Sequence, residues 1–220
     1  MDMVAVIVAG GRARRMGGGD KTLRLLAGRP MLVHVWEAIA PQVARVALSG
    51  NGPPERFAAV LPRVPVLADA APDQGPLAGV VAGLRWAAQN GASRLLTVPG
   101  DTPFLPGTLV ETLLREARSA GTPGACARSA ERRHPLVGLW DVALESPLTA
   151  FLAAGERTVE RFLAAHAFAV ADFPPGPPDP FMNVNTPEDL ARAKEEESRG
   201  VGGEGQASPP TPLDSFSFLV

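Results

Sequence analysis

The segment MVAVIVAG, residues 3–10, determines the fold. It is a continuous apolar run, rich in valine and ending in glycine, which is typical of a strand buried on both faces of a parallel sheet. Such a strand needs helices on both sides. Further apolar runs lie at 43–49, 64–68, 94–98, 136–140 and 168–173, and helical patterns lie at about 30–40, 77–89, 106–119 and 157–166. This alternation predicts an α/β fold with a mostly parallel sheet and right-handed crossovers.

The C-terminal part of the chain predicts a loop, a helix and a tail. The proline-rich PPGPPDP, residues 174–180, does not fit a sheet or helix interior and therefore predicts a surface loop. In TPED, residues 186–189, a capping threonine, a proline and two acidic residues indicate the start of a helix. Beyond that helix the chain is rich in glycine, serine and proline. We predict one domain over 1–197 and a disordered tail over 198–220.

Composition excludes several classes of protein. The chain has 220 residues, is 45% hydrophobic and carries a formal net charge of −2, which suits one globular domain and argues against nucleic acid as a partner. It has no apolar run of membrane-spanning length and no basic leader, so we expect no membrane association and a cytoplasmic location. Its single cysteine, Cys126, cannot form an internal disulfide or a thiolate metal cluster, and we interpret it as a core residue.

The densest chemical signal is AGGRARRMGGGDK, residues 9–21, directly after the first predicted strand. Its glycines allow backbone N–H groups to close around a ligand, and its clustered cations would repel one another unless an anion lay among them. We therefore predict a polyphosphate cradle. It is not a Walker A loop, because Asp20 separates glycine from Lys21, and the spacing G-x-G-x-x-G is absent. The alternative is a surface loop with solvated arginines.

Two further segments place polar groups at the ends of predicted strands. In RLLTVPGDTPF, residues 94–104, Asp101 follows a buried strand and could hold Mg²⁺ against phosphate oxygens; the alternative is an ordinary helix-capping turn. In DQGPLAG, residues 73–79, the glycines could approach a base or ribose, or simply allow tight packing. Asp69 could accept hydrogen bonds from a nucleoside, or be an exposed turn residue.

Several motifs, in order and spacing, resemble those of the molybdenum cofactor guanylyltransferases, a branch of the nucleotidyltransferases with a Rossmann-like, three-layer sheet. The resemblance covers nearly all of residues 3–197. The motifs are AGGRARRMGGGDK, GPLAG, GDTPF, RRHPL, AGERTV and NVNTPEDL.

The resemblance implies that the enzyme joins GTP to molybdopterin, or to its molybdenum-loaded form, and releases pyrophosphate. We expect an in-line displacement on the α-phosphorus with Mg²⁺ as cofactor, which needs positioning and charge neutralisation rather than a general base or a covalent intermediate. Molybdenum-insertion proteins and apo-molybdoenzymes are the further partners that the resemblance implies.

The family's functional positions carry over residue by residue. The resemblance implies catalytic roles for Arg15, Lys21 and Asp101, with Asp101 also as the metal ligand. It implies nucleotide contacts at Val8, Ala9, Gly10, Gly11, Lys21, Asp69 and Asp101. Candidates for the acceptor site are His134, Arg157, Asn183 and Asn185. The two asparagines stand where relatives outside this branch often carry a metal-binding aspartate, so the number of protein ligands to Mg²⁺ stays open.

Two alternatives remain. A CTP-using molybdopterin cytidylyltransferase or a sugar-phosphate nucleotidyltransferase would share the same active-site logic, although the AGG start favours guanine over the AAG typical of cytidylyl relatives. A nucleotide-binding protein without turnover is the other, and Lys21 together with Asp101 favours the enzyme.

Overall fold

The computed structural model describes residues 3–9, 20–50, 53–68 and 75–200, except the side chains of residues 197, 199 and 200. Within these residues a seven-stranded sheet has the order β5-β4-β1-β6-β8-β7-β9. Its strands are β1 Met3–Val8, β4 Arg45–Ser49, β5 Val66–Leu67, β6 Arg94–Pro99, β7 Gly124–Ser129, β8 Arg132–Asp141 and β9 Ala169–Asp172. A small hairpin pairs β2 Leu25–Leu26 with β3 Arg29–Pro30.

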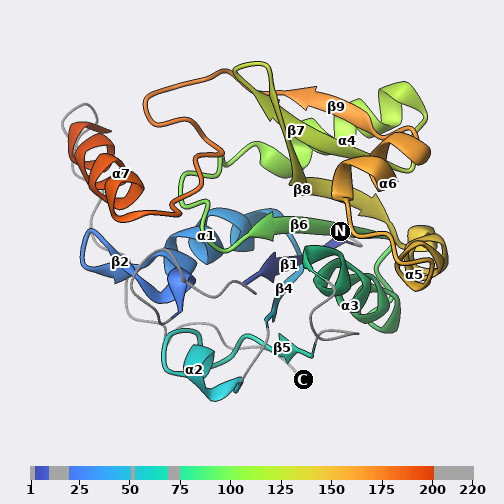
Figure 1. Cartoon of the computed structure of the whole chain (residues 1–220), viewed down its shortest axis with the longest axis horizontal. Helices are drawn as coiled ribbons and strands as arrows, with labels where there is room; N and C mark the ends of the chain where they lie inside the picture. Colours follow the sequence, from blue (N-terminus) through green and yellow to red (C-terminus); the bar gives the residue numbers. More distant parts are fainter. Residues whose placement is uncertain (1–2, 10–19, 51–52, 69–74, 201–220) are drawn as a thin grey trace.

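Helices cover both faces of the sheet, as Figure 1 shows. The α-helices are α1 Met31–Ile39, α2 Glu55–Ala58, α3 Pro76–Gln89, α4 Leu109–Ala120, α5 Glu145–Ala153, α6 Val159–Ala165 and α7 Pro187–Gly200. Short 3₁₀ helices are η2 Lys21–Leu23, η3 Ala40–Gln42 and η4 Val142–Leu144. No helix in the described ranges is long and apolar enough to cross a bilayer.

The central strand β1 divides the core into two layers. Its residues Met3, Ala5 and Ile7 belong to a core cluster that also contains residues of α1 and α4, whereas Val4 and Val6 belong to a second cluster with residues of α3, α5 and α6. This alternation is the period of two that a strand imposes on its side chains. The predicted three-layer α/β architecture is therefore confirmed, and the strand is buried on both faces.

The sheet is mostly parallel, with one strand reversed. β1 runs parallel to β4 and β6, so that Val6 lies beside Ala47 and Thr97. β8 runs antiparallel to both β6 and β7. Only Ala130 and Glu131 connect β7 to β8, both at positive φ, and a two-residue turn can join only antiparallel strands.

Most of the sequence-based element predictions are confirmed, and several elements were missed. The expected strands and helices recur with ends shifted by a few residues, and Cys126 is buried in β7, where burial raises the pKa of its thiol. Neither β7 nor α5 was predicted, nor were the short helix α2 and the β2–β3 hairpin. The C-terminal helix continues to Gly200, three residues into the predicted tail, and the rest of that tail lies outside the described residues.

The close packing of α3 on the sheet gives a test of the fold. A Cβ atom at Gly83 would lie 2.9 Å from both Leu95 Cδ2 and Val6 Cγ2. We therefore expect Gly83→Val to lower the free energy of unfolding by about 1–3 kcal/mol through overpacking. Ala88→Val, on the exposed side of the same helix, should cost only about 0.6 kcal/mol. Urea denaturation measures both, and equal losses would contradict this packing.

Candidate active site

Three segments converge beyond the carboxyl ends of β1 and β6. They are the start of η2, the turn after β6, and residues 181–186 before α7 (Figure 1). In an open α/β sheet this edge is where ligands bind, because the strand ends and the connections that follow them leave a crevice there.

Backbone contacts fix the turn that carries Asp101. The Gly100 N–H donates to the carbonyl of Val8 at 3.0 Å, and the Asp101 carbonyl accepts from the Val184 N–H at 2.9 Å. Glycine is required at 100 because a Cβ there would lie 2.9 Å from Thr22 Cγ2. The turn is thereby held between β1, η2 and the segment before α7.

The segment before α7 is held by its side chains. Thr102 is fully buried and its Oγ1 donates to Asn183 Oδ1 at 2.8 Å. Asp189 Oδ2 accepts from the N–H groups of Asn185 and Thr186, both at 3.0 Å, and the Asp189 N–H donates to Thr186 Oγ1 at 3.1 Å. This reciprocal capping confirms Thr186 as the start of the helix and fixes Asn185 beside it.

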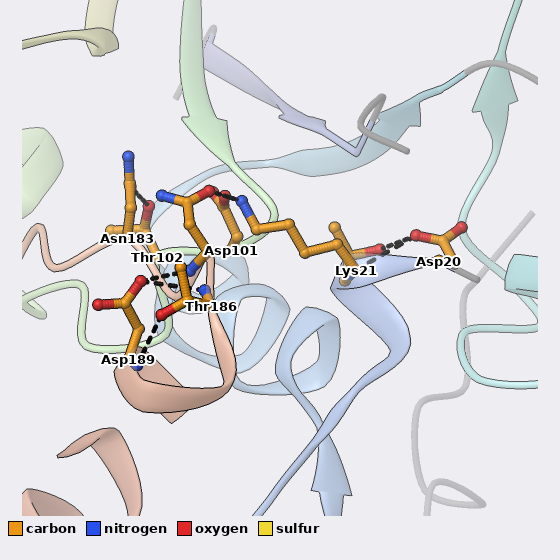
Figure 2. Close-up of polar contacts among 9 residues, drawn as sticks. Asp20, Lys21, Asp101, Thr102, Asn183, Thr186 and Asp189 are labelled. Atoms are coloured by element: carbon orange, nitrogen blue, oxygen red, sulfur yellow. Dashed lines mark hydrogen bonds and ion pairs between the residues drawn. The ribbon is translucent and has the colours of Figure 1, made fainter. Parts of the chain in front are cut away.

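Lys21 connects these segments. Its Nζ forms an ion pair with Asp101 Oδ2 and also donates to Asn185 Oδ1. Figure 2 shows the lysine side chain extended toward Asp101. The Lys21 and Asp101 side chains are only 14% and 15% exposed. Each compensates the charge of the other, which would be unfavourable if it were partly buried alone. The structure thus brings together Lys21, Asp101 and Asn185, which are far apart in the sequence.

The donor set fits a divalent cation held in part by substrate. Among the described residues, no three His, Cys, Asp or Glu side chains form a metal cluster. However, one carboxylate oxygen of Asp101 and the amide oxygen of Asn185 already contact the same cation, the Lys21 ammonium. Mg²⁺ commonly takes one or two protein carboxylates and completes its shell with water and phosphate oxygens, so a single carboxylate such as Asp101 is compatible with such a site.

The remaining nucleotide-site predictions concern some residues that the structure describes and others that it does not. Val8 ends β1, and the buried Ala9 donates its N–H to the carbonyl of Ser49 at 2.7 Å, so both lie at this edge. The predictions for Gly10, Gly11, Arg15 and Asp69 concern positions outside the described residues.

The structure separates the two remaining acceptor candidates. His134 precedes the part of β8 that pairs with β6, so it lies past the carboxyl end of β6. Its Nε2 is 3.0 Å from Ser129 Oγ, which also donates to Asp179 Oδ1 at 3.1 Å.

Arg157 is not brought to this edge. It lies between α5 and α6, which Figure 1 shows at the end of the sheet opposite α7. Its Nη1 donates to the carbonyls of Leu152 and Glu156, both at 2.7 Å. These bonds satisfy carbonyls near the end of α5, a structural role that the sequence pattern did not indicate.

Sequence reasoning missed the residues that orient the site. Asp20 caps η2, Thr22 packs against Gly100, and Thr102 holds Asn183. An aspartate two residues before a threonine is a common local hydrogen-bonding pattern, and this was the available signal for Asp20.

Comparison with known proteins agrees with this geometry. The family model described as the MobA-like NTP transferase domain matches residues 5–170. The chain belongs to the MobA-like NTP transferase family. It is therefore a nucleotidyltransferase by descent.

The alignments with individual relatives cover most of this chain and most of each relative. A molybdenum cofactor guanylyltransferase of Cereibacter sphaeroides is 50% identical over 196 residues, which cover 88% of this chain and 96% of the relative. One from Rhodopseudomonas palustris strain HaA2 is 47% identical over 86% of this chain and 90% of its own. A solved structure, the molybdopterin-guanine dinucleotide biosynthesis protein A of Archaeoglobus fulgidus, has a TM-score of 0.68 at 24% identity, covering 90% and 99% of the two chains, and supports the fold.

The environment of His134 predicts a pH dependence of stability. Burial lowers the pKa of His134 below its ordinary value, although nearby Asp179 opposes the shift. Because the fold disfavours the charged ring, the unfolded chain takes up the proton first, and stability falls as pH drops below about 6.5. We expect urea unfolding between pH 7.5 and 5 to show this loss, and His134→Gln to show a shallower one. An unchanged slope in the variant would contradict this assignment.

Proposed function

We propose that this transferase moves GMP from GTP to the terminal phosphate of molybdopterin, or of its molybdenum-loaded form, and releases pyrophosphate. The observation that carries the proposal is the contact between Lys21 and Asp101 at the carboxyl edge of the sheet. A pure nucleotide binder has no need for a carboxylate opposite a cationic lysine. The names of the half-identical relatives support guanylyl transfer and the molybdenum cofactor as its acceptor.

The reaction transfers one phosphoryl centre between two oxygens. An oxygen of the acceptor phosphate forms a bond to the α-phosphorus of GTP, while the bond from that phosphorus to the bridging oxygen breaks and its electron pair leaves with pyrophosphate. Both reactants are anions, and negative charge increases on the leaving group. Catalysis therefore requires alignment and charge compensation. No base is needed, because the attacking phosphate is already ionised near neutral pH.

The two charged side chains have complementary roles in this scheme. Lys21 supplies positive charge to the triphosphate, and its contact with Asn185 helps to hold the ammonium at the edge of the sheet. Asp101 would hold Mg²⁺, which when bound supplies positive charge to the phosphate oxygens and aligns them for displacement. The two residues approach from different segments of the chain, and a triphosphate between them would contact both.

The acceptor would approach from the side of the segment before α7. Asn183 and Asn185 carry amide N–H groups that can donate to a phosphate, and their oxygens are already engaged by Thr102 and Lys21. His134 lies at the same edge of the sheet and is the third acceptor candidate. Arg157 is excluded from this proposal because it lies elsewhere.

Other parts of the assignment rest on the sequence resemblance. These are the roles of Gly10, Gly11, Arg15 and Asp69, the identity of the metal as Mg²⁺, the cytoplasmic location, and the contacts with molybdenum-insertion proteins and apo-molybdoenzymes. They stay predictions.

Turnover with a panel of nucleotides tests the proposed function. Purified protein with Mg²⁺, molybdopterin and each nucleoside triphosphate should release pyrophosphate and form a dinucleotide with GTP. Formation of product with CTP would move the protein to the cytidylyltransferases. Activity only with a sugar phosphate as acceptor would also refute the assignment, and so would GTP binding without any turnover.

Substitution of the carboxylate tests its role. Asp101→Asn should lower kcat/KM for GTP by about 100-fold or more, because a neutral amide holds a divalent cation less tightly than a carboxylate does, and the cation balances the phosphate charge. The matched control is Asp141→Asn, which makes the same change where β8 pairs with the amino end of β6. Initial rates of pyrophosphate release measure both variants. Normal turnover in Asp101→Asn would contradict the assigned role.

A further inference from the structure

Two neighbouring residues of opposite charge, Asp20 and Lys21, turn their side chains in opposite directions (Figure 2). The Asp20 carboxylate is 9% exposed. Its Oδ1 accepts from the Thr22 N–H at 3.3 Å and from Thr22 Oγ1 at 3.0 Å. Its Oδ2 lies 3.0 Å from Arg56 Nη1. Asp20 is thus directed away from the lysine that follows it.

Arg56 is itself held in place. It belongs to α2, in the connection between β4 and β5, and its guanidinium lies 4.3 Å from the ring centroid of Phe57. Phe57 is fully buried in the core. Within the described residues the Arg56 contact to Asp20 Oδ2 is an ion pair without hydrogen-bond alignment. The carboxylate is therefore compensated at this oxygen by charge, and removal of Arg56 would leave this oxygen buried without any other ion-pair partner among the described residues.

This arrangement matters because two carboxylates can compete for the Lys21 ammonium. Asp20 precedes Lys21 in the sequence, and Asp101 contacts it in the structure. An Asp20 carboxylate without Arg56 would gain most by attracting Lys21, which would draw the lysine away from Asp101. Thr22 connects the two sides, since it donates to Asp20 while its methyl group packs where a Cβ of Gly100 would lie. Asp101 directly follows Gly100.

We propose that Asp20, held by Arg56, is a positioning residue that directs Lys21 toward Asp101. It does not touch the substrate in this scheme. It acts by fixing the first turn of η2 and by having its own charge neutralised from the other side. A purely structural role for Asp20 is the alternative, in which its loss would change stability and leave the position of Lys21 relative to Asp101 unaltered.

The composition of the chain makes a direct test possible. Lys21 and Lys194 are the only lysines in the sequence. Protein labelled with ¹³C and ¹⁵N in lysine alone therefore gives two sets of side-chain NMR signals, and a Lys194→Arg variant assigns them. The Lys21 Cε and Nζ signals report its ion pair, and Asp101→Ala supplies the reference for a lysine released from that contact.

We expect Asp20→Asn to move the Lys21 signals toward those of Asp101→Ala, and Arg56→Gln to move them away from their wild-type positions as the lysine turns toward Asp20. The matched control is Arg85→Gln, which breaks the ion pair with Glu145 elsewhere in the molecule and should leave the Lys21 signals in place. If Asp20→Asn fails to fold, Arg56→Gln carries the same test. Wild-type Lys21 signals in a variant with a native amide spectrum would overturn the proposal.

Kinetics give a second readout, and this one rests on the proposed function. Asp20→Asn should lower kcat/KM for GTP by about 10- to 100-fold, the scale of a misplaced catalytic group. In a Lys21→Ala background the same substitution should change kcat/KM less than twofold, because its effect passes through Lys21. Equal losses in both backgrounds would overturn the proposal. The NMR test needs neither GTP nor acceptor, so wild-type protein without guanylyl transfer would refute only the proposed function.

Discussion

The ion pair between Lys21 and Asp101 is the contact on which the site depends. It joins the first helical turn after β1 to the turn after β6, and the Lys21 contact with Asn185 adds the segment before α7. Each partner is mostly buried, so neither charge would be tolerated there alone. The parallel pairing of β1 with β6 makes this contact possible, because it places both strand ends at one edge of the sheet.

Much of the fold could be predicted from periodicity, and its failures have physical causes. Strands such as β1 and β4 are rich in apolar residues that only a doubly covered sheet accommodates. β7 was missed because Gly124–Ser129 contains no β-branched residue and its burial comes from its neighbours. α5 was missed because Pro147 interrupts its pattern, although proline is tolerated within the first turn of a helix. The reversal of β8 depends on a two-residue turn without glycine, which carries little sequence signal.

The charged residues at the centre of the site could be predicted better than the residues that hold them in place. Lys21 and Asp101 follow buried strands, and that position alone indicates convergence at one edge. Asn183 and Asn185 were recognised through their motif, and the structure adds that Thr102 and Lys21 hold them. The ion pair of Asp20 with Arg56 could not be predicted, because it joins residues 36 positions apart through a short helix and leaves no periodic pattern. Arg157 is the opposite case. Its motif suggested a ligand contact, but its guanidinium donates to backbone carbonyls of the chain itself.

A crystal structure with Mg²⁺ and a GTP analogue that carries a methylene group between the α- and β-phosphates would test the central claim most directly. The bridging carbon prevents cleavage, so the bound geometry persists. The account predicts triphosphate density between the two side chains, with Lys21 Nζ on phosphate oxygens and a carboxylate oxygen of Asp101 on the metal. Triphosphate bound at another edge of the sheet, with Lys21 and Asp101 still paired only to each other, would contradict it.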